Sequence, residues 1–176
     1  MIDFISSTIP VLVLVSHFVL LFFLLALLAK NSWGARIVNW VGKHVLFIGL
    51  MTSLMAVLGS LFYSNAVGFE PCYLCWWQRV AIYPLLILFL TALKGKDRGV
   101  FKYAFRLAVI AVGISLYHLY IQSGGDPLIP CDAAATCSKL YVYAFGYISI
   151  PLMSLTIGAS VILLDWANRI YENRHS

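Results

Sequence analysis

The stretch PCYLCWWQRVAIYPLLILFLTAL, Pro71 to Leu93, places two cysteines and one arginine at the start of a long apolar run. No charged residue follows Arg79 within it, and about 20 mostly apolar residues are enough for an α-helix to cross a bilayer. We therefore predict a membrane-spanning helix from the cysteine pair to Leu93. The whole chain agrees, because 62% of its residues are hydrophobic and 11% are charged, against roughly one quarter charged in soluble domains.

Four further apolar runs are long enough to span a membrane: Phe4 to Ala29, Val45 to Tyr63, about Tyr103 to Gln122, and about Ile148 to Asp165. The alternation expected of barrel strands is absent, which leaves helices as the spanning structure. The leader MIDFISSTIP carries an acid and no basic residue, so the first run is interpreted as a retained helix. We expect one all-α membrane domain over residues 1–176, with a four-helix core over 45–165 and an additional helix over 4–29.

The basic residues predict the orientation of the five spans. Ten of the twelve fall in the 30–44 loop, the 94–106 link and the C-terminal tail. Cytoplasmic loops are enriched in Lys and Arg, so the N-terminus is expected outside and the C-terminus in the cytoplasm of a bacterial inner membrane. The net charge of +5 is thereby explained without a nucleic-acid partner. Whether Trp33–His44 lies along the inner surface stays open.

All four cysteines fall on the predicted outer face: Cys72, Cys75, Cys131 and Cys137. The second pair lies in an outer loop over residues 123–147. Thiols outside the cytoplasmic membrane meet an oxidising environment, where paired cysteines are expected as disulfides. This distribution indicates redox or structural disulfides.

The first pair is predicted to favour a thiolate. Pro71 suits the first position of a helix, which would place Cys72 and Cys75 in the first turn, at the positive end of the helix dipole. Arg79 follows Cys75 by one turn and adds a permanent positive charge. Such a thiolate suits disulfide exchange and electron transfer, although Arg79 could also be an interfacial anchor of the helix.

The second pair, Cys131 and Cys137, follows a turn-rich stretch over 123–127. A disulfide across so short a ring stabilises a fold only modestly, which favours exchange with another protein over a purely structural clip. Zinc binding by all four thiolates is a rival interpretation. Haem of the c type is excluded at the first pair, because Trp76 stands where a CxxCH motif needs histidine.

Two further residue types are candidates for a cofactor site. Trp76 belongs to a cluster of aromatic residues at the predicted outer interface, where an aromatic belt is ordinary, although such rings could also wall a pocket for a flat molecule. His118 lies near the outer end of the fourth run, and a lone histidine there is more often a packed core residue. His17 has no companion in the sequence, and no role is predicted for it.

The motif CYLCWWQRVAIYP, the later cysteine pair and FGYISIPLMSL together resemble the disulfide bond formation protein B (DsbB) family, and more closely its short BdbC-like branch. The resemblance covers about residues 45–165. It implies a membrane enzyme that reoxidises a DsbA-like thioredoxin-fold thiol oxidase and passes the electrons to ubiquinone or menaquinone.

The resemblance also implies a role for each matching residue. Cys131 and Cys137 would form the disulfide that the reduced partner attacks, and Cys72 and Cys75 would reoxidise it. Cys75 would face the quinone, Arg79 would help to hold it, and His118 would lie near it. The additional helix over 4–29 and Gln78, in place of an acidic residue, depart from the family pattern.

Two alternatives differ from this reading. A vitamin K epoxide reductase-like enzyme also combines a CxxC with a loop pair, but there the loop pair precedes the CxxC, whereas Cys131 and Cys137 follow it here. A non-enzymatic scaffold would use its disulfides only to brace the outer loops.

Overall fold

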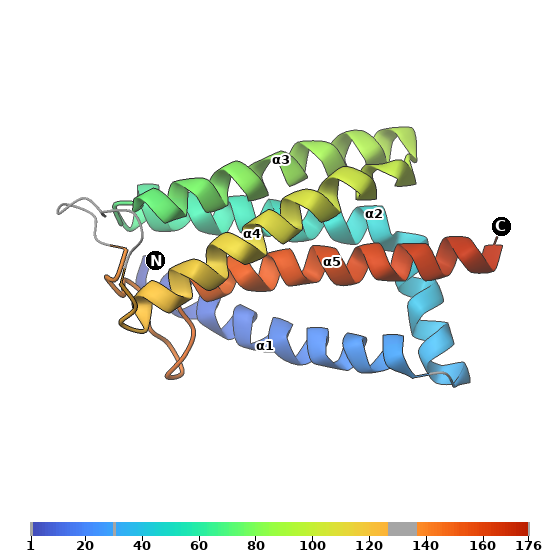
Figure 1. Ribbon diagram of the computed structural model, residues 1–176, viewed down its shortest axis with the longest axis horizontal. Helices are drawn as coiled ribbons and strands as arrows, with labels where there is room; N and C mark the ends of the chain where they lie inside the picture. The colour runs from blue at the N-terminus through green and yellow to red at the C-terminus, as the bar shows by residue number, and fades with distance from the viewer. Residues whose placement is uncertain (1, 30, 127–136, 176) are drawn as a thin grey trace.

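Five long helices make up the computed structural model, which describes residues 2–29, 31–126 and 137–175 (Figure 1). They are α1 (Ile2–Leu28), α2 (Ser32–Leu61), α3 (Tyr73–Gly95), α4 (Phe101–Gln122) and α5 (Ile150–His175), with short turns η1 (Phe62–Ala66) and η2 (Arg98–Val100). All five are long and apolar enough to cross a bilayer. The prediction of a five-span, all-α membrane protein is confirmed.

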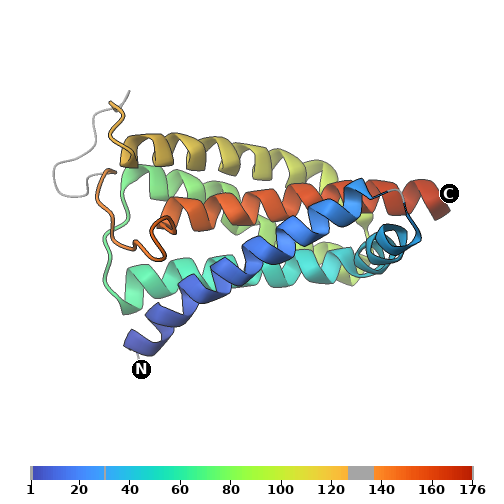
Figure 2. The same ribbon diagram turned by 90° about the horizontal axis from the view of Figure 1, so that it is seen from below.

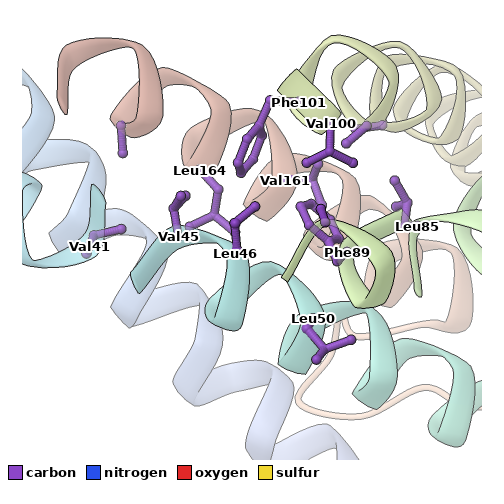
Figure 3. Packing of buried hydrophobic residues seen from close by; sticks show 14 of the residues in the cluster. Val41, Val45, Leu46, Leu50, Leu85, Phe89, Val100, Phe101, Val161 and Leu164 are labelled. Atoms are coloured by element: carbon purple, nitrogen blue, oxygen red, sulfur yellow. The ribbon is translucent and has the colours of Figure 1, made fainter. Parts of the chain in front are cut away.

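Helices α2 to α5 form a bundle, and α1 lies diagonally over α2 and α5 (Figures 1 and 2). The largest core cluster joins all four bundle helices, as Figure 3 shows with Leu46, Phe89, Phe101 and Val161 among its members. Close approach of helices in membranes depends on small residues. Gly49 of α2 meets this need, because a Cβ atom there would lie 2.7 Å from the Phe89 ring.

The second helix begins earlier than predicted. The 30–44 segment was expected to be a loop, but α2 starts at Ser32, and the Asn31 side chain caps it by accepting a hydrogen bond from the Gly34 N–H at 2.9 Å. The loop prediction was wrong because basic residues mark a membrane face without preventing a helix. This first part of α2 runs across the end of the bundle before the helix turns into it (Figures 1 and 2).

The two ends of the bundle differ in what they carry. The start of α3, the end of α4 and the start of α5 lie together at one end, while the α3–α4 connection and the C-terminus lie at the other (Figure 1). The cysteines described by the structure all belong to the first of these ends. The functional site is therefore expected there.

Candidate redox site

The first cysteine pair sits at the start of α3. Cys72 is the N-cap, with an extended backbone (φ −68°, ψ 169°), and Tyr73 is the first helical residue. Pro71 is thus one residue before the cap, and the expectation that it opens the helix, with both cysteines in its first turn, was wrong for Pro71 and Cys72. Cys75 does lie in the first turn, where backbone N–H groups have no partner within the helix.

Three cysteines from two distant parts of the chain meet at this point: Cys72 and Cys75 of the first pair, and Cys137 of the second. The Sγ atoms of Cys72 and Cys75 are 3.1 Å apart. Cys72 and Cys137 are buried in one apolar cluster with Leu74 and Ile121, and Cys75 packs against it. The loop after α4 therefore returns Cys137 to the CxxC. Cys131, the other member of the second pair, lies outside the described residues.

A buried histidine connects the two segments. The Nε2 of His118 lies 3.0 Å from the carbonyl oxygen of Cys137 and 3.8 Å from the Cys72 Sγ. Because a carbonyl only accepts, Nε2 carries the proton and donates it. The Gln78 amide then donates to Nδ1, at 3.4 Å. Gln78 is 3% exposed, and no sequence signal connects it with His118, 40 residues along the chain.

An apolar cleft of about 820 Å³ opens on the other side of Cys75. Its walls come from α1, α2, α3 and α5, with Met51, Met55 and Ile82 among the lining residues. Cys75 also lines a small hollow shared by Cys72, His118 and Cys137. Of the cysteines in the described ranges, Cys75 is the one that reaches both the sulfur cluster and the cleft.

Arg79 brings a positive charge to the wall of this cleft. Its Nε donates to the Ser60 Oγ at 3.0 Å, and its Nη2 donates to the Ser60 carbonyl at 3.2 Å. The Tyr83 hydroxyl also donates to the Ser60 Oγ, at 3.1 Å. Among the side chains of residues 6–29, 31–126 and 137–175 the one ion pair is Arg169–Asp165, and the Arg79 guanidinium donates to neutral oxygens. Sequence spacing gave no sign of Ser60.

The remaining site candidates take different positions. Trp76 is 55% exposed and is absent from the cleft lining, although the Arg79 guanidinium lies over its ring, 5.2 Å from the centroid. His118 lies on the sulfur side of Cys75 and lines the small hollow. The site therefore separates the four residues predicted around a cofactor: Cys75 and Arg79 line the cleft, and Trp76 and His118 do not.

The zinc alternative meets a geometric difficulty. Cys72, Cys75 and His118 offer ligand atoms within 4.8 Å of one another. However, the Nε2 of His118 donates its proton to the Cys137 carbonyl, and Nδ1 accepts from Gln78. A metal at the sulfur atoms would need the Nε2 lone pair, so the bond to the Cys137 carbonyl would have to break and the Gln78 amide would have to rotate to accept from Nδ1.

The acidity of Cys72 provides a test of this arrangement. The hydrogen bond with Cys75, followed by burial, raises the pKa of the Cys72 thiol to about 12. A raised pKa keeps the thiol protonated, so alkylation of Cys72, which needs the thiolate, should keep rising with pH well beyond the ordinary value of 9.0. We expect this profile for the reduced protein, measured by mass spectrometry of rapidly quenched alkylation.

The matched control is Cys75→Ala. It removes the hydrogen bond that is the larger cause of the raised pKa, so alkylation of Cys72 should begin at lower pH than in the parent protein. A Cys72 rate that levels off near pH 9 in the parent would contradict the arrangement.

A multi-pass helical bundle with a buried cysteine cluster beside an apolar cleft suits a membrane thiol–disulfide redox protein. Comparison with known proteins agrees. The family profile described as "Disulfide bond formation protein DsbB" matches residues 42–167. The chain therefore belongs to the DsbB family of disulfide bond formation proteins, and it is a disulfide oxidoreductase of the membrane.

Several curated relatives carry matching names. A protein of Bacillus cereus, "Probable disulfide formation protein C 2", is 36% identical over 127 residues, covering 72% of this chain and 91% of the relative. "Disulfide bond formation protein C" of Bacillus subtilis is 36% identical over 120 residues, covering 67% and 87%. "Probable disulfide formation protein C" of Halalkalibacterium halodurans is 41% identical over 112 residues, covering 60% and 79%. No solved structure matches the chain significantly.

Proposed function

We propose that the protein is a quinone-linked thiol oxidase that reoxidises a DsbA-like thioredoxin-fold partner. The partner's dithiol reduces the Cys131–Cys137 disulfide and becomes a disulfide itself. The two thiols so formed reduce the Cys72–Cys75 disulfide by exchange. The Cys72–Cys75 dithiol then returns to the disulfide and gives up two electrons and two protons, which a membrane quinone takes to become a quinol. In each step one dithiol is oxidised to a disulfide, while one disulfide is reduced to a dithiol or one quinone is reduced to a quinol, so the electrons balance.

The observation that carries this proposal is that Cys75 lies beside the Cys72 sulfur and also lines the apolar cleft. Its sulfur lies 3.1 Å from that of Cys72, and its side chain lines the apolar cleft. The cleft volume, about 820 Å³, is within the roughly 300 to 1,000 Å³ of ordinary ligand pockets. Its mostly apolar wall with a few polar groups suits a quinone ring with a prenyl tail, which arrives from the lipid.

Arg79 supports an electron acceptor that becomes anionic. Its guanidinium carries a positive charge and has neutral oxygens of Ser60 as its partners. The cation is therefore available to stabilise negative charge that develops on a reduced ring in the cleft. Trp76, under the guanidinium, would orient Arg79 without touching the acceptor.

His118 would act on the exchange step between the two cysteine pairs. Its Nε2–H lies 3.8 Å from the Cys72 Sγ and is bonded to the Cys137 carbonyl. A proton donor at this distance can stabilise a thiolate forming on Cys72 as it leaves a disulfide. The hydrogen bond to Cys137 would also hold the returning loop against the CxxC.

The proposed orientation has the cysteines on the outer side of the inner membrane. It is supported by the basic residues of the α3–α4 connection and the C-terminal tail, which lie at the bundle end opposite to the cysteines (Figure 1). Lys and Arg concentrate on the cytoplasmic side of membrane proteins. A secreted partner would then have access to the second pair.

The test is a thiol count on the full chain with Cys131 and Cys137 both changed to serine, which leaves one redox pair. The protein is reduced in detergent, freed of reductant under argon, and sampled by mass-shift labelling before and after adding a short-tailed ubiquinone or menaquinone analogue. We expect both thiols to disappear together, only with quinone, as quinol forms. Thiols that persist with quinone, or vanish equally fast without it, would overturn the proposal and favour metal ligands or structural disulfides.

A further inference from the structure

Helix α1 lies outside the residues that match the DsbB family profile, 42–167, yet it borders the cleft. Figure 2 shows it crossing diagonally over α2 and α5 on one side of the bundle. It packs into the core at Phe23 and Ala26. The side of the cleft between α2 and α5 is therefore covered by a segment outside the family match.

One face of α1 supplies this cover. Ile9, Leu12, Val13 and Ser16 line the cleft and follow the three- and four-residue spacing of a single helix face. Val11 and Val15 do not line the cleft. The exposed fraction does not distinguish them from Leu12, because Val11, Leu12 and Val15 are 45%, 51% and 52% exposed. After Pro10 the helix is apolar on every side except at Ser16 and His17, so composition alone does not reveal which face contacts the cleft.

His17 fixes this face in place. The Thr156 hydroxyl donates to the Leu152 carbonyl, so its oxygen is free to accept from the His17 Nε2 at 2.8 Å. With the proton on Nε2, Nδ1 accepts from the Tyr147 hydroxyl at 3.2 Å. These two bonds connect the middle of α1 to α5 and to the segment before it, and Thr156 itself lines the cleft.

We propose that α1 forms the lipid-side wall of the acceptor site, and that Ile9, Leu12 and Val13 determine which prenylated quinones bind there. This inference rests on the proposed function. A quinone with its ring near Cys75 and Arg79 would have its ring substituents and the first part of its tail between α2 and α5. There it would meet α1 side chains in place of acyl chains. The selectivity for the acceptor thus resides partly in a helix that the family match does not include.

The experiment compares Leu12→Trp, which fills the cleft, with Val11→Trp, which adds the same ring to the lipid-facing side. We expect Leu12→Trp to raise the KM for a prenylated quinone by about tenfold or more, since a hydrophobic pocket discriminates by roughly 10- to 200-fold for one methylene. Val11→Trp should stay within about twofold of the parent KM. Exchange of the cysteine pairs with a small dithiol, measured without quinone, should be the same in both variants.

A second pair of variants guards against misfolding. Leu12→Ala enlarges the cleft and should raise the KM ratio of short-tailed to long-tailed quinone, while Val11→Ala should leave that ratio unchanged. The parent protein must first reduce quinone. If it does, and the Leu12 variants show the same KM and the same KM ratio as the parent, the proposed role of α1 is overturned. A parent that ignores quinone would instead overturn the proposed function, so the two failures are distinguishable.

Discussion

Changing Cys75 to serine is expected to abolish quinone reduction by the protein, a loss of at least about a thousandfold, as for other residues that form covalent intermediates. Serine can neither form a disulfide with Cys72 nor give up electrons. Cys75 also provides the sulfur on the cleft wall. The measurement is quinol formation, followed by absorbance, from the reduced full-length protein and a short-tailed quinone under argon.

The matched variant is Cys72→Ser, which also loses turnover because it lacks half of the pair. The two variants should differ in labelling by an apolar maleimide that enters from the membrane. Cys75, on the cleft, should react in Cys72→Ser, whereas Cys72, which is 3% exposed and absent from the cleft lining, should react slowly in Cys75→Ser. Equal labelling, or quinol formation that survives in Cys75→Ser, would contradict the assignment of Cys75 to the quinone.

The second large effect is expected for Arg79→Ala, which should lower kcat/KM for quinone by about 10- to 100-fold. A hydrogen bond to a charged group contributes about 1.5 to 3 kcal/mol, and 1.4 kcal/mol corresponds to a factor of ten in rate. Arg79→Lys should recover part of this loss, because it keeps the charge but cannot reproduce both bonds to Ser60. The measurement is the initial rate of quinol formation against quinone concentration.

Two comparisons isolate the contribution of the charge. Tyr83→Phe removes a hydrogen bond to the same Ser60 oxygen without removing a charge, and its loss should be smaller than that of Arg79→Ala. Disulfide exchange with a small dithiol, measured without quinone, should be equal in Arg79→Ala and the parent. An unchanged quinone dependence in Arg79→Ala would show that the cation does not act on the acceptor.

The helices and the class of protein could be predicted from local composition. A span of about 20 apolar residues is a local property, so all five helices are visible in the sequence, and CxxC followed by Arg79 is a local motif. Boundaries were less accurate. The start of α2 at Ser32 depends on the cap formed by Asn31, and the start of α3 at Tyr73 depends on the extended backbone of Cys72.

Contacts across the bundle could not be predicted in this way. Ser60 meets Arg79 across 19 residues, and His118 meets Gln78 across 40. A lone serine or glutamine in an apolar helix has no periodic signature. Which of these side chains meet depends on the rotation and depth of each helix, which are set by packing such as that of Gly49 against Phe89.

The sequence by itself determined that this protein is a helical membrane protein, and it predicted one outer face for its four cysteines, because hydropathy and charge act residue by residue. Only the tertiary structure decided which groups surround each sulfur. It turned Cys75 towards the cleft, buried Cys72 beside His118, and laid α1, held by His17, along one wall of the cleft. These positions follow from close packing between helices, which depends on the whole bundle at once.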